Sequence, residues 1–350
     1  MLRSAIRVLS STARHSIFSP PIRTLGSVTA CPYRVSESLK MAVDTKLIKE
    51  RVASNPKIAA VLTDGAGTSG DSRGKGTKAA MTEVTENHFE KVGVQIIDPI
   101  YPIEEHNGTG KLPHFIKVLE WLRDNDRQVE KRYQANPHLL MQDAHAILNR
   151  LTTEGVKIIK DFSTPVPGFK QLAQKLKALE KFLILQTAYG KHEAEAFEDK
   201  MKEGGVIFDY RVTSSDVKNP RSFPAMLHKT LDYCKLFPWN CVVLGDTPAD
   251  MMAALGFWSI GLPDHSAFLP SRDMSPEELH HERVRVANLL IQHGAHYVLL
   301  DADWRKPEPL DVKLFRVIED IELRMSQGYF PEMLSQATPE FKSELKLGCR

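Results

Sequence analysis

Two short apolar runs, each followed by an aspartate, constrain the fold more than any other feature of this sequence. The run Ile58–Leu62 is unbroken and rich in branched aliphatic side chains, and Asp64 follows it closely. Such a run, bounded by turn residues, is typical of a strand buried on both faces of a parallel sheet. The run Val242–Leu244 has the same character and leads through Gly245 to Asp246. We therefore expect an α/β protein with a doubly wound, Rossmann-like parallel sheet, whose ligands bind at the carboxyl ends of the strands.

Aspartates that follow neighbouring parallel strands would meet in one pocket. Asp250 follows Asp246 by four residues, and Pro248 suits the first turn of a helix in this segment. Carboxylate oxygens are hard ligands of the kind that Mg²⁺ prefers. The alternative is that Asp64 and Asp246 are unrelated residues that only cap helices. The strand-end spacing favours a magnesium site.

Together these segments resemble the haloacid dehalogenase superfamily, whose first motif begins with a nucleophilic Asp and whose last is of the Gly-Asp-Thr-x-x-Asp type. Within it the sequence is similar to the phosphonoacetaldehyde hydrolases, or phosphonatases, whose motif Asp-x-Ala-Gly-Thr matches Asp64–Thr68. The resemblance covers residues 57–325. It implies that Asp64 is the nucleophile and that Asp64, the Ala66 carbonyl and Asp246 hold Mg²⁺, with Asp250 positioning the metal shell.

Residues 79–163 are expected to form a helical cap inserted into a core made of residues 57–78 and 164–325. Apolar spacing such as that of Phe115–Leu122 predicts amphipathic helices here, and an inserted lid can exclude water from a site. Phosphonatases carry their cap at this position, with a Gly-x-x-Lys-x-x-His segment. Taken alone, Lys111 would be a solvated side chain. The resemblance instead implies that Lys111 forms a Schiff base with the substrate aldehyde and that His114 is a polar neighbour.

The resemblance also implies two phosphate-binding residues. Thr187 follows the predicted strand Phe182–Leu185 and occupies the position of the superfamily's second motif, where a hydroxyl binds phosphate. Arg221 lies in a segment similar to the phosphonatase Arg-x-x-Pro, and its guanidinium could bind phosphate oxygens in a bidentate manner. A surface arginine in a proline-rich loop is the competing interpretation. Further strands are predicted at Val206–Val212, Trp258–Leu262 and Ala295–Leu300.

The implied reaction is hydrolysis of phosphonoacetaldehyde, a small-molecule phosphonate, to acetaldehyde and phosphate. An imine on Lys111 would make the carbon–phosphorus bond cleavable, and attack by Asp64 would form an aspartyl phosphate. Three features depart from the family. Asn107 replaces a usual Met, Ala188 replaces a usual Gly, and the loop Ser72–Gly76 is expected to be an insertion. The wider segment from Ser69 is polar and glycine-rich, which predicts a loop that is not packed.

Two alternative functions remain open. A phosphomonoesterase or mutase of the same superfamily would need an acid two residues after the nucleophile, where this chain has Ala66. A non-catalytic metabolite-binding relative would be favoured by loss of an acidic or lysine position. However, Asp64, Lys111, Asp246 and Asp250 are all present. The oligomeric state is also open, a homodimer included.

The first 36 residues differ from the rest of the chain. They contain arginines at 3, 7 and 14 near one helical face, many serines, and no acid before Glu37. This composition is typical of a mitochondrial transit peptide and predicts a matrix location. The alternative is a disordered tail on a cytoplasmic protein. Residues 326–350 lie beyond the resemblance and receive no predicted role.

The overall composition excludes some classes of function. A formal net charge of +2 does not favour nucleic-acid binding, and no apolar run approaches the length of a membrane span. The four cysteines at positions 31, 234, 241 and 349 form no metal-binding pair. They are expected to be free thiols in a reducing compartment.

Overall fold

The computed structural model describes residues 45–96, 111–270, 272–301 and 303–331. The predicted transit peptide therefore lies outside the described residues, as do Asn107, Gly108 and residues 332–350 of the C-terminal extension. Cys234 and Cys241 are free thiols, as predicted.

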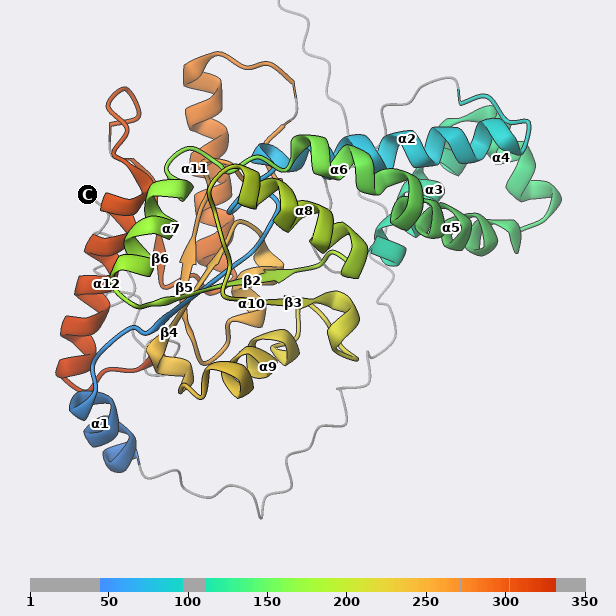
Figure 1. The fold of residues 1–350 in the computed structure, drawn as a ribbon. Helices are drawn as coiled ribbons and strands as arrows, with labels where there is room; N and C mark the ends of the chain where they lie inside the picture. The colour runs from blue at the N-terminus through green and yellow to red at the C-terminus, as the bar shows by residue number, and fades with distance from the viewer. Residues whose placement is uncertain (1–44, 97–110, 271, 302, 332–350) are drawn as a thin grey trace, which may run out of the picture. The chain divides into compact units, whose positions relative to one another are not determined.

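Six parallel strands form one sheet within the described ranges, in the order β3-β2-β1-β4-β5-β6 (Figure 1). Their bounds are β1 Ala60–Thr63, β2 Phe182–Thr187, β3 Tyr210–Thr213, β4 Cys241–Gly245, β5 Trp258–Gly261 and β6 Tyr297–Val298. The chain starts at the central strand β1, builds one edge, and then returns to build the other from β4. The strand order therefore switches direction between β1 and β4, where a doubly wound sheet binds its ligand. The predicted fold class is confirmed.

Helices cover both faces of the sheet because successive strand residues point to opposite sides. Val61 and Leu185 belong to the core shared with α7, α8 and α12, whereas Leu62 and Ile184 pack toward α9 and α10 on the other face. Helix α11 packs beside α10 over the edge formed by β5 and β6. The bounds are α1 Thr45–Ser54, α7 Phe169–Ala178, α8 Lys191–Glu203, α9 Ala225–Cys234, α10 Pro248–Ala253, α11 Pro276–Gln292 and α12 Leu310–Ser326.

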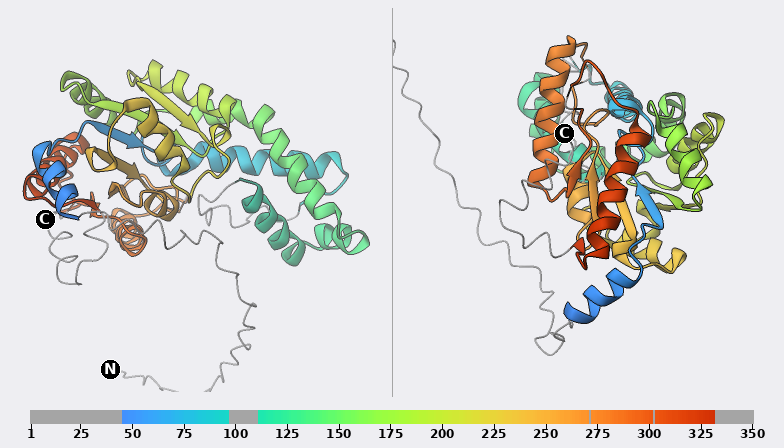
Figure 2. Two further views of the ribbon diagram at one scale, coloured as in Figure 1. Left: turned by 90° about the horizontal axis from the view of Figure 1, so that it is seen from below. Right: turned by 90° about the vertical axis from the view of Figure 1, so that its left-hand side faces the viewer.

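The described part of the segment between β1 and β2, called the cap below, is mostly helical. Its helices are α2 Lys75–Lys91, α3 Lys111–Asn125, α4 Arg127–Ala135, α5 Leu139–Arg150 and α6 Val156–Phe162, with a π-helical turn at Leu151–Gly155. Helices α2 and α6 pack side by side where the chain leaves and re-enters the core, while α3 packs on α5 (Figures 1 and 2).

The two junctions between cap and core are joined to each other. Gly70, before the cap, forms a β-bridge with Pro165, which follows it. The Asp71 N–H donates a hydrogen bond to the Thr164 carbonyl at 3.2 Å. The cap is therefore attached to the core through two connecting segments that lie next to each other.

The prediction that the loop Ser69–Gly76 is not packed is wrong. Most of its residues are buried, and α2 already begins at Lys75. The Ser69 hydroxyl donates to the Asp64 carbonyl at 2.7 Å, and the Asp71 carboxylate accepts the backbone N–H of Thr77 at 3.0 Å. A polar, glycine-rich loop can be buried when its own side chains satisfy its polar groups in this way.

The predicted strand Val206–Val212 also begins later than expected, at Tyr210. Gly205 has a φ of +84°, and the Asp209 side chain accepts the N–H of Leu183 at 2.7 Å. These residues form a turn that leads into the edge strand. Val206 is buried beside the sheet at 1% exposed, whereas Ile207 is 60% exposed, so the apolar run does not mark a buried strand.

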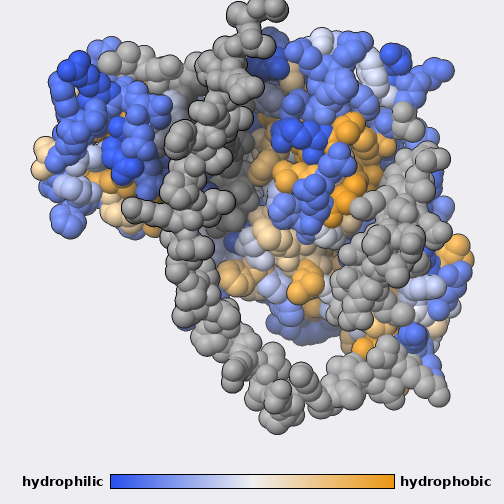
Figure 3. Space-filling model, turned by 180° about the vertical axis from the view of Figure 1, so that it is seen from behind, coloured by the Kyte–Doolittle hydropathy of each residue, from blue (hydrophilic) through white to orange (hydrophobic). Residues whose placement is uncertain are grey.

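Apolar and hydrophilic residues are interspersed on the surface. Figure 3 shows this on the rear face, where apolar patches lie among hydrophilic residues. Several large apolar side chains are exposed, such as Leu255 at 72% and Ile207 at 60%. In the part of the chain that the structure describes, no helix has both the length and the apolar character needed to cross a membrane.

A buried ionic network holds the cap helices together. The Asp143 carboxylate on α5 accepts two hydrogen bonds from Arg132 on α4, at 2.8 and 2.9 Å. It also contacts the Tyr133 hydroxyl at 3.1 Å and His88 Nε2 at 2.9 Å. Burial alone would raise the pKa of Asp143, but the hydrogen bonds from His88 and Arg132 outweigh it and lower the pKa to about 2.

Asp143→Asn is expected to lower the free energy of unfolding by about 3 kcal/mol, because Arg132 would stay largely buried without its counter-charge. In the native protein this stabilisation is fully present above the ordinary aspartate pKa of 3.8 and is lost as the pH falls toward 2. Urea unfolding followed by circular dichroism measures the change. Asp124→Asn in α3, whose side chain is 62% exposed, is the matched control and should leave the free energy of unfolding nearly unchanged. Equal losses in both variants would contradict a special role for the network.

Candidate active site

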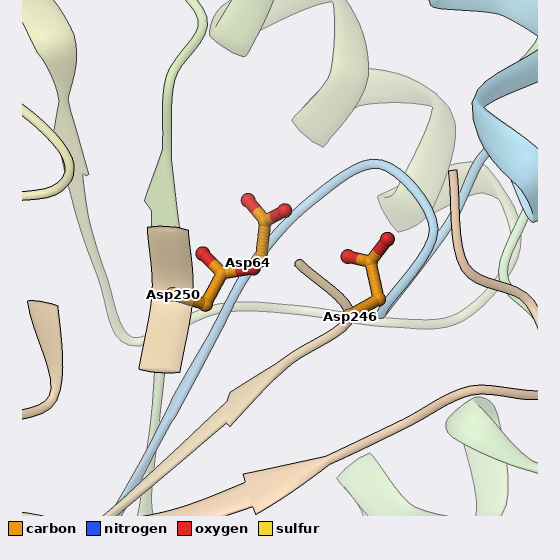
Figure 4. A group of neighbouring side chains, drawn as sticks. All are labelled: Asp64, Asp246 and Asp250. Carbon is orange, nitrogen blue, oxygen red and sulfur yellow. The ribbon is translucent and has the colours of Figure 1, made fainter. Parts of the chain in front are cut away.

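Three buried carboxylates meet at the carboxyl end of the sheet. Strands β1 and β4 are neighbours with Thr63 paired to Leu244, so Asp64 and Asp246 leave the sheet side by side. Asp250 joins them from the first turn of α10. Ligand atoms of the three carboxylates lie within 4.8 Å of one another, and Figure 4 shows the three side chains pointing the same way. The sequence prediction of one acidic pocket therefore agrees with the geometry.

A capping box fixes Asp250. Thr247 is the N-cap of α10, and Pro248 at the first helical position needs no hydrogen-bond acceptor for its nitrogen. One Asp250 oxygen accepts the Thr247 N–H at 3.0 Å and the Thr247 hydroxyl at 2.7 Å. The other oxygen, Oδ1, lies 2.8 Å from Nη1 of Arg221.

Asp246 is held from both sides. One carboxylate oxygen accepts a hydrogen bond from the Thr68 hydroxyl at 2.6 Å, and the other accepts the Ala267 N–H at 2.8 Å. Burial and the neighbouring carboxylates of Asp64 and Asp250 raise the pKa of Asp246 well above its usual range. Burial likewise raises the pKa of Asp250 to about 6.

Arg221 lies between the carboxylates. Its Nη2 donates to Asp64 Oδ1 and, at 2.6 Å, to the Gln186 carbonyl, while Nη1 contacts Asp250 Oδ1 at 2.8 Å. Burial disfavours its charge, but Asp250 and Asp64 outweigh burial and raise the pKa of Arg221. The guanidinium is thus bound to carboxylates here, and a phosphate would have to compete with them for it.

The charges and donor atoms of this pocket fit a divalent cation. If all three carboxylates were ionised, the single guanidinium of Arg221 would leave two negative charges uncompensated in a buried space. Burying unpaired charge is costly, and oxygen ligands suit hard divalent cations. Asp64, Asp246 and Asp250 could hold such an ion, and Ala66 lies in the loop between Asp64 and Thr68 that borders the same pocket.

One cavity extends from Asp64 to the cap, and Asp246 and Asp250 are not among the residues that line it. It is lined by five of the residues that sequence reasoning singled out: Asp64, Ala66, Lys111, Thr187 and Arg221. Thr187 ends β2, and its hydroxyl oxygen accepts the N–H of Tyr189 at 3.1 Å. Residues from β1, β2, the cap and the loop before α9 thus converge on one space.

His114 does not line this cavity. It lies one turn after Lys111 on α3, on the apolar face with Phe115, and is 5% exposed. Burial, with a smaller contribution from Lys117, lowers the pKa of His114 to about 4. His114 therefore belongs to the packed side of α3, and the residues that line the cavity do not include it.

Lys111 has a partner that sequence reasoning missed. Its Nζ lies 2.5 Å from Oε1 of Glu193 in the first turn of α8 and 5.1 Å from the centre of the Tyr189 ring. The two charged side chains are 11% and 2% exposed, respectively. Burial lowers the pKa of the Lys111 amine below its usual 10.5, while Glu193 partly opposes this. One signal was available, because Glu193 lies one turn before the buried Phe197 on the same helical face.

Comparisons with known proteins agree with this architecture. The family model described as haloacid dehalogenase-like hydrolase matches residues 54–257. A bifunctional phosphonoacetaldehyde hydrolase/aminoethylphosphonate transaminase from Clostridioides difficile is 24% identical over 251 residues, 69% of this chain but only 38% of that protein. A phosphonoacetaldehyde hydrolase from Parabacteroides distasonis is 24% identical over 253 residues, 69% of this chain and 92% of that protein. The crystal structure of a phosphonoacetaldehyde hydrolase like protein from Oleispira antarctica has a TM-score of 0.64 at 23% identity, covering 78% of this chain and 96% of that one.

Proposed function

Because this chain belongs to the haloacid dehalogenase-like hydrolases, we propose that it hydrolyses the carbon–phosphorus bond of phosphonoacetaldehyde. The observation that carries the proposal is the presence of Lys111 in the same cavity as Asp64. Phosphate-ester hydrolysis needs no amine, whereas cleavage of a carbon–phosphorus bond beside an aldehyde needs an electron acceptor. The relatives named phosphonoacetaldehyde hydrolase support the same substrate.

The Lys111 amine would first condense with the aldehyde. The resulting iminium can accept the electron pair of the carbon–phosphorus bond and become an enamine, so that a carbon that otherwise leaves poorly becomes a leaving group. The lowered pKa of Lys111 increases the fraction of neutral amine, which is the form that attacks a carbonyl.

Asp64 would then attack phosphorus. The new oxygen–phosphorus bond forms as the carbon–phosphorus bond breaks, giving an aspartyl phosphate that water hydrolyses. Thr187 and Arg221 would bind the phosphoryl oxygens from the side of β2. Mg²⁺ held by Asp64, Asp246 and the Ala66 carbonyl, with Asp250 beside it, would neutralise developing negative charge when bound.

Gly67→Ala is expected to weaken Mg²⁺ binding by about 10–100-fold. A Cβ at position 67 would lie 2.4 Å from Asp246 Oδ2, so the carboxylate would have to move. Isothermal titration calorimetry measures the affinity. Gly93→Ala is the matched control, because Gly93 also has a positive φ, +74°, but has open space around its Cα. If both variants bind Mg²⁺ like the native protein, Asp246 does not hold the metal.

The rival phosphomonoesterase activity is expected to be weak. Phosphatases of this superfamily place an acid at the position of Ala66 to protonate the leaving oxygen, and general acid catalysis is worth about 10²–10⁴ in rate. An enamine leaving group needs no such acid at that place. Release of acetaldehyde and phosphate from phosphonoacetaldehyde should therefore exceed phosphate release from simple sugar phosphates. Faster turnover of the sugar phosphates would favour the esterase instead.

A further inference from the structure

Glu193 is a buried acid that accepts a hydrogen bond from the amine of Lys111. Its carboxylate lies at the start of α8 in the core, whereas Lys111 opens α3 in the cap. The two atoms are 2.5 Å apart, and Glu193 is 1% exposed as a whole residue. The pair is thus largely shielded from water, so a proton can pass between the Lys111 amine and the Glu193 carboxylate without first passing to solvent.

The backbone around Glu193 is built closely against the carboxylate. A Cβ on Gly190 would lie 2.6 Å from Glu193 Oε2, so only a glycine fits there without displacing the acid. The N-terminal end of a helix also favours a carboxylate, since its free N–H groups carry partial positive charge. The carboxylate is therefore fixed in position on the Lys111 side of the cavity.

We propose that Glu193 is the proton acceptor and donor for imine formation at Lys111. The inference rests on the proposed function, which makes the Lys111 amine the reacting group. Among the described residues, Glu193 is the carboxylate in hydrogen-bond contact with Nζ. This contact crosses from core to cap, so the proton-transfer pair exists only when the two are together.

The proton balance closes with this single acid. Glu193 takes one proton from the Lys111 ammonium. The neutral amine then forms a bond to the aldehyde carbon, the carbon–oxygen double bond becomes single, and the oxygen gains a proton from the attacking nitrogen. The carbinolamine hydroxyl then leaves as water with the proton that Glu193 returns, and the carbon–nitrogen double bond forms. Glu193 ends as the carboxylate it was at the start, so aldehyde and ammonium give iminium and water without an added oxidant or reductant.

Other titratable groups face the same cavity and have to be separated from Glu193 in any pH profile. They are Lys78 from α2, Tyr189 after β2, Asp64 after β1 and Arg221 before α9. Lys78 Nζ donates to the Leu269 carbonyl at 3.0 Å, and the Tyr189 hydroxyl contacts Thr77 at 2.7 Å. Burial, with a contribution from Asp71, raises the pKa of Tyr189, so it stays neutral over the working range.

The test is the rate of borohydride trapping of an aldehyde on Lys111, followed by peptide mass mapping across pH. Phosphonoacetaldehyde and acetaldehyde are the two probes. For Glu193→Gln we expect the trapping rate at pH values below the Lys111 pKa, where the Lys111–Glu193 pair holds its proton, to fall by about 10²–10⁴-fold. The pH at which Lys111 titrates should also fall, because removing the carboxylate lowers the Lys111 pKa further. Glu195→Gln on the same helix, 44% exposed and paired with His192 and Arg211, should behave like the native enzyme.

A second variant distinguishes two roles for Glu193: proton transfer, and a purely structural contact that holds the cap on the core. Glu193→Ala should regain trapping in proportion to added formate, which can enter the vacated space and carry the proton. Loss of trapping without rescue by formate, in a variant with native circular dichroism, would make Glu193 a clamp and overturn the proposal. Native-like trapping by Glu193→Gln would overturn it while leaving the proposed function intact. If the native enzyme forms no adduct on Lys111 with either probe, the proposed function and this inference both fail.

Discussion

Asp64→Asn is expected to abolish phosphate release from phosphonoacetaldehyde, with kcat falling by about 10⁴–10⁶-fold. The neutral amide is a poor nucleophile toward phosphorus, so no aspartyl phosphate can form. The substitution keeps the size and shape of a side chain that is 6% exposed, and Arg221 retains Asp250 and the Gln186 carbonyl as partners. The fold should therefore survive. Coupled assays of acetaldehyde and phosphate, together with circular dichroism, separate loss of chemistry from loss of structure.

Imine formation should persist in this variant, since Lys111 is unchanged. Borohydride should still trap an adduct on Lys111 in Asp64→Asn, which distinguishes the phosphoryl step from the carbonyl step. The control is Asp320→Asn on α12, which also removes a carboxylate paired with an arginine, Arg324, at 2.8 Å. Near-normal turnover by Asp64→Asn would exclude Asp64 as the nucleophile.

Lys111→Arg is expected to lose both turnover and trapping, again by about 10⁴-fold or more in kcat. The guanidinium can keep the charge beside Glu193 but stays protonated at working pH and cannot form an imine. In the native enzyme the trapping rate should change with pH as Lys111 titrates. That change should lie below the ordinary lysine pKa of 10.5, because burial lowers the pKa of this amine.

Lys117→Arg supplies the internal control for that result. Lys117 lies further along α3 and is exposed, so its replacement should leave trapping and turnover unchanged. An adduct mapped to Lys117, or full activity in Lys111→Arg, would mean that the lysine of the cap has been assigned incorrectly. An adduct on Lys78, the other lysine that lines the cavity, would move the carbonyl chemistry from α3 to α2.

The acidic pocket could be predicted from sequence because it depends on local rules. A short apolar run followed by Asp is recognisable wherever it occurs, and parallel strands deliver their ends to one edge. Asp64 and Asp246 therefore had to be near each other once β1 and β4 were neighbours. The sequence also predicted helices between β1 and β2, since the apolar spacing of α3 is visible in Phe115, Val118 and Leu122.

The contacts across the site could not be predicted in the same way. Arg221 meets Asp64 although 157 residues separate them, and Lys111 meets Glu193 across 82 residues. Neither partner lies in the local pattern of the other. The prediction for the segment from Ser69 to Gly76 was wrong for a related reason. The burial of this segment depends on hydrogen bonds that its polar composition does not reveal. Composition indicates the polarity of a segment but not whether its polar groups find partners.

The paired junctions of the cap have a consequence for how such enzymes can change. Because Gly70 is bridged to Pro165, the whole of α2 to α6 is one continuous stretch of gene that enters and leaves the core at a single place. Such a cassette could be exchanged without rearranging β1 and β4, the strands that bring Asp64 and Asp246 together. Transplanting the cassette onto another core of this family would transfer Lys111, which lies on α3, but not Glu193, which lies on α8 in the core. On the proposal above, a working graft would therefore need both the cassette and an acidic residue at the position of the host core that is equivalent to Glu193.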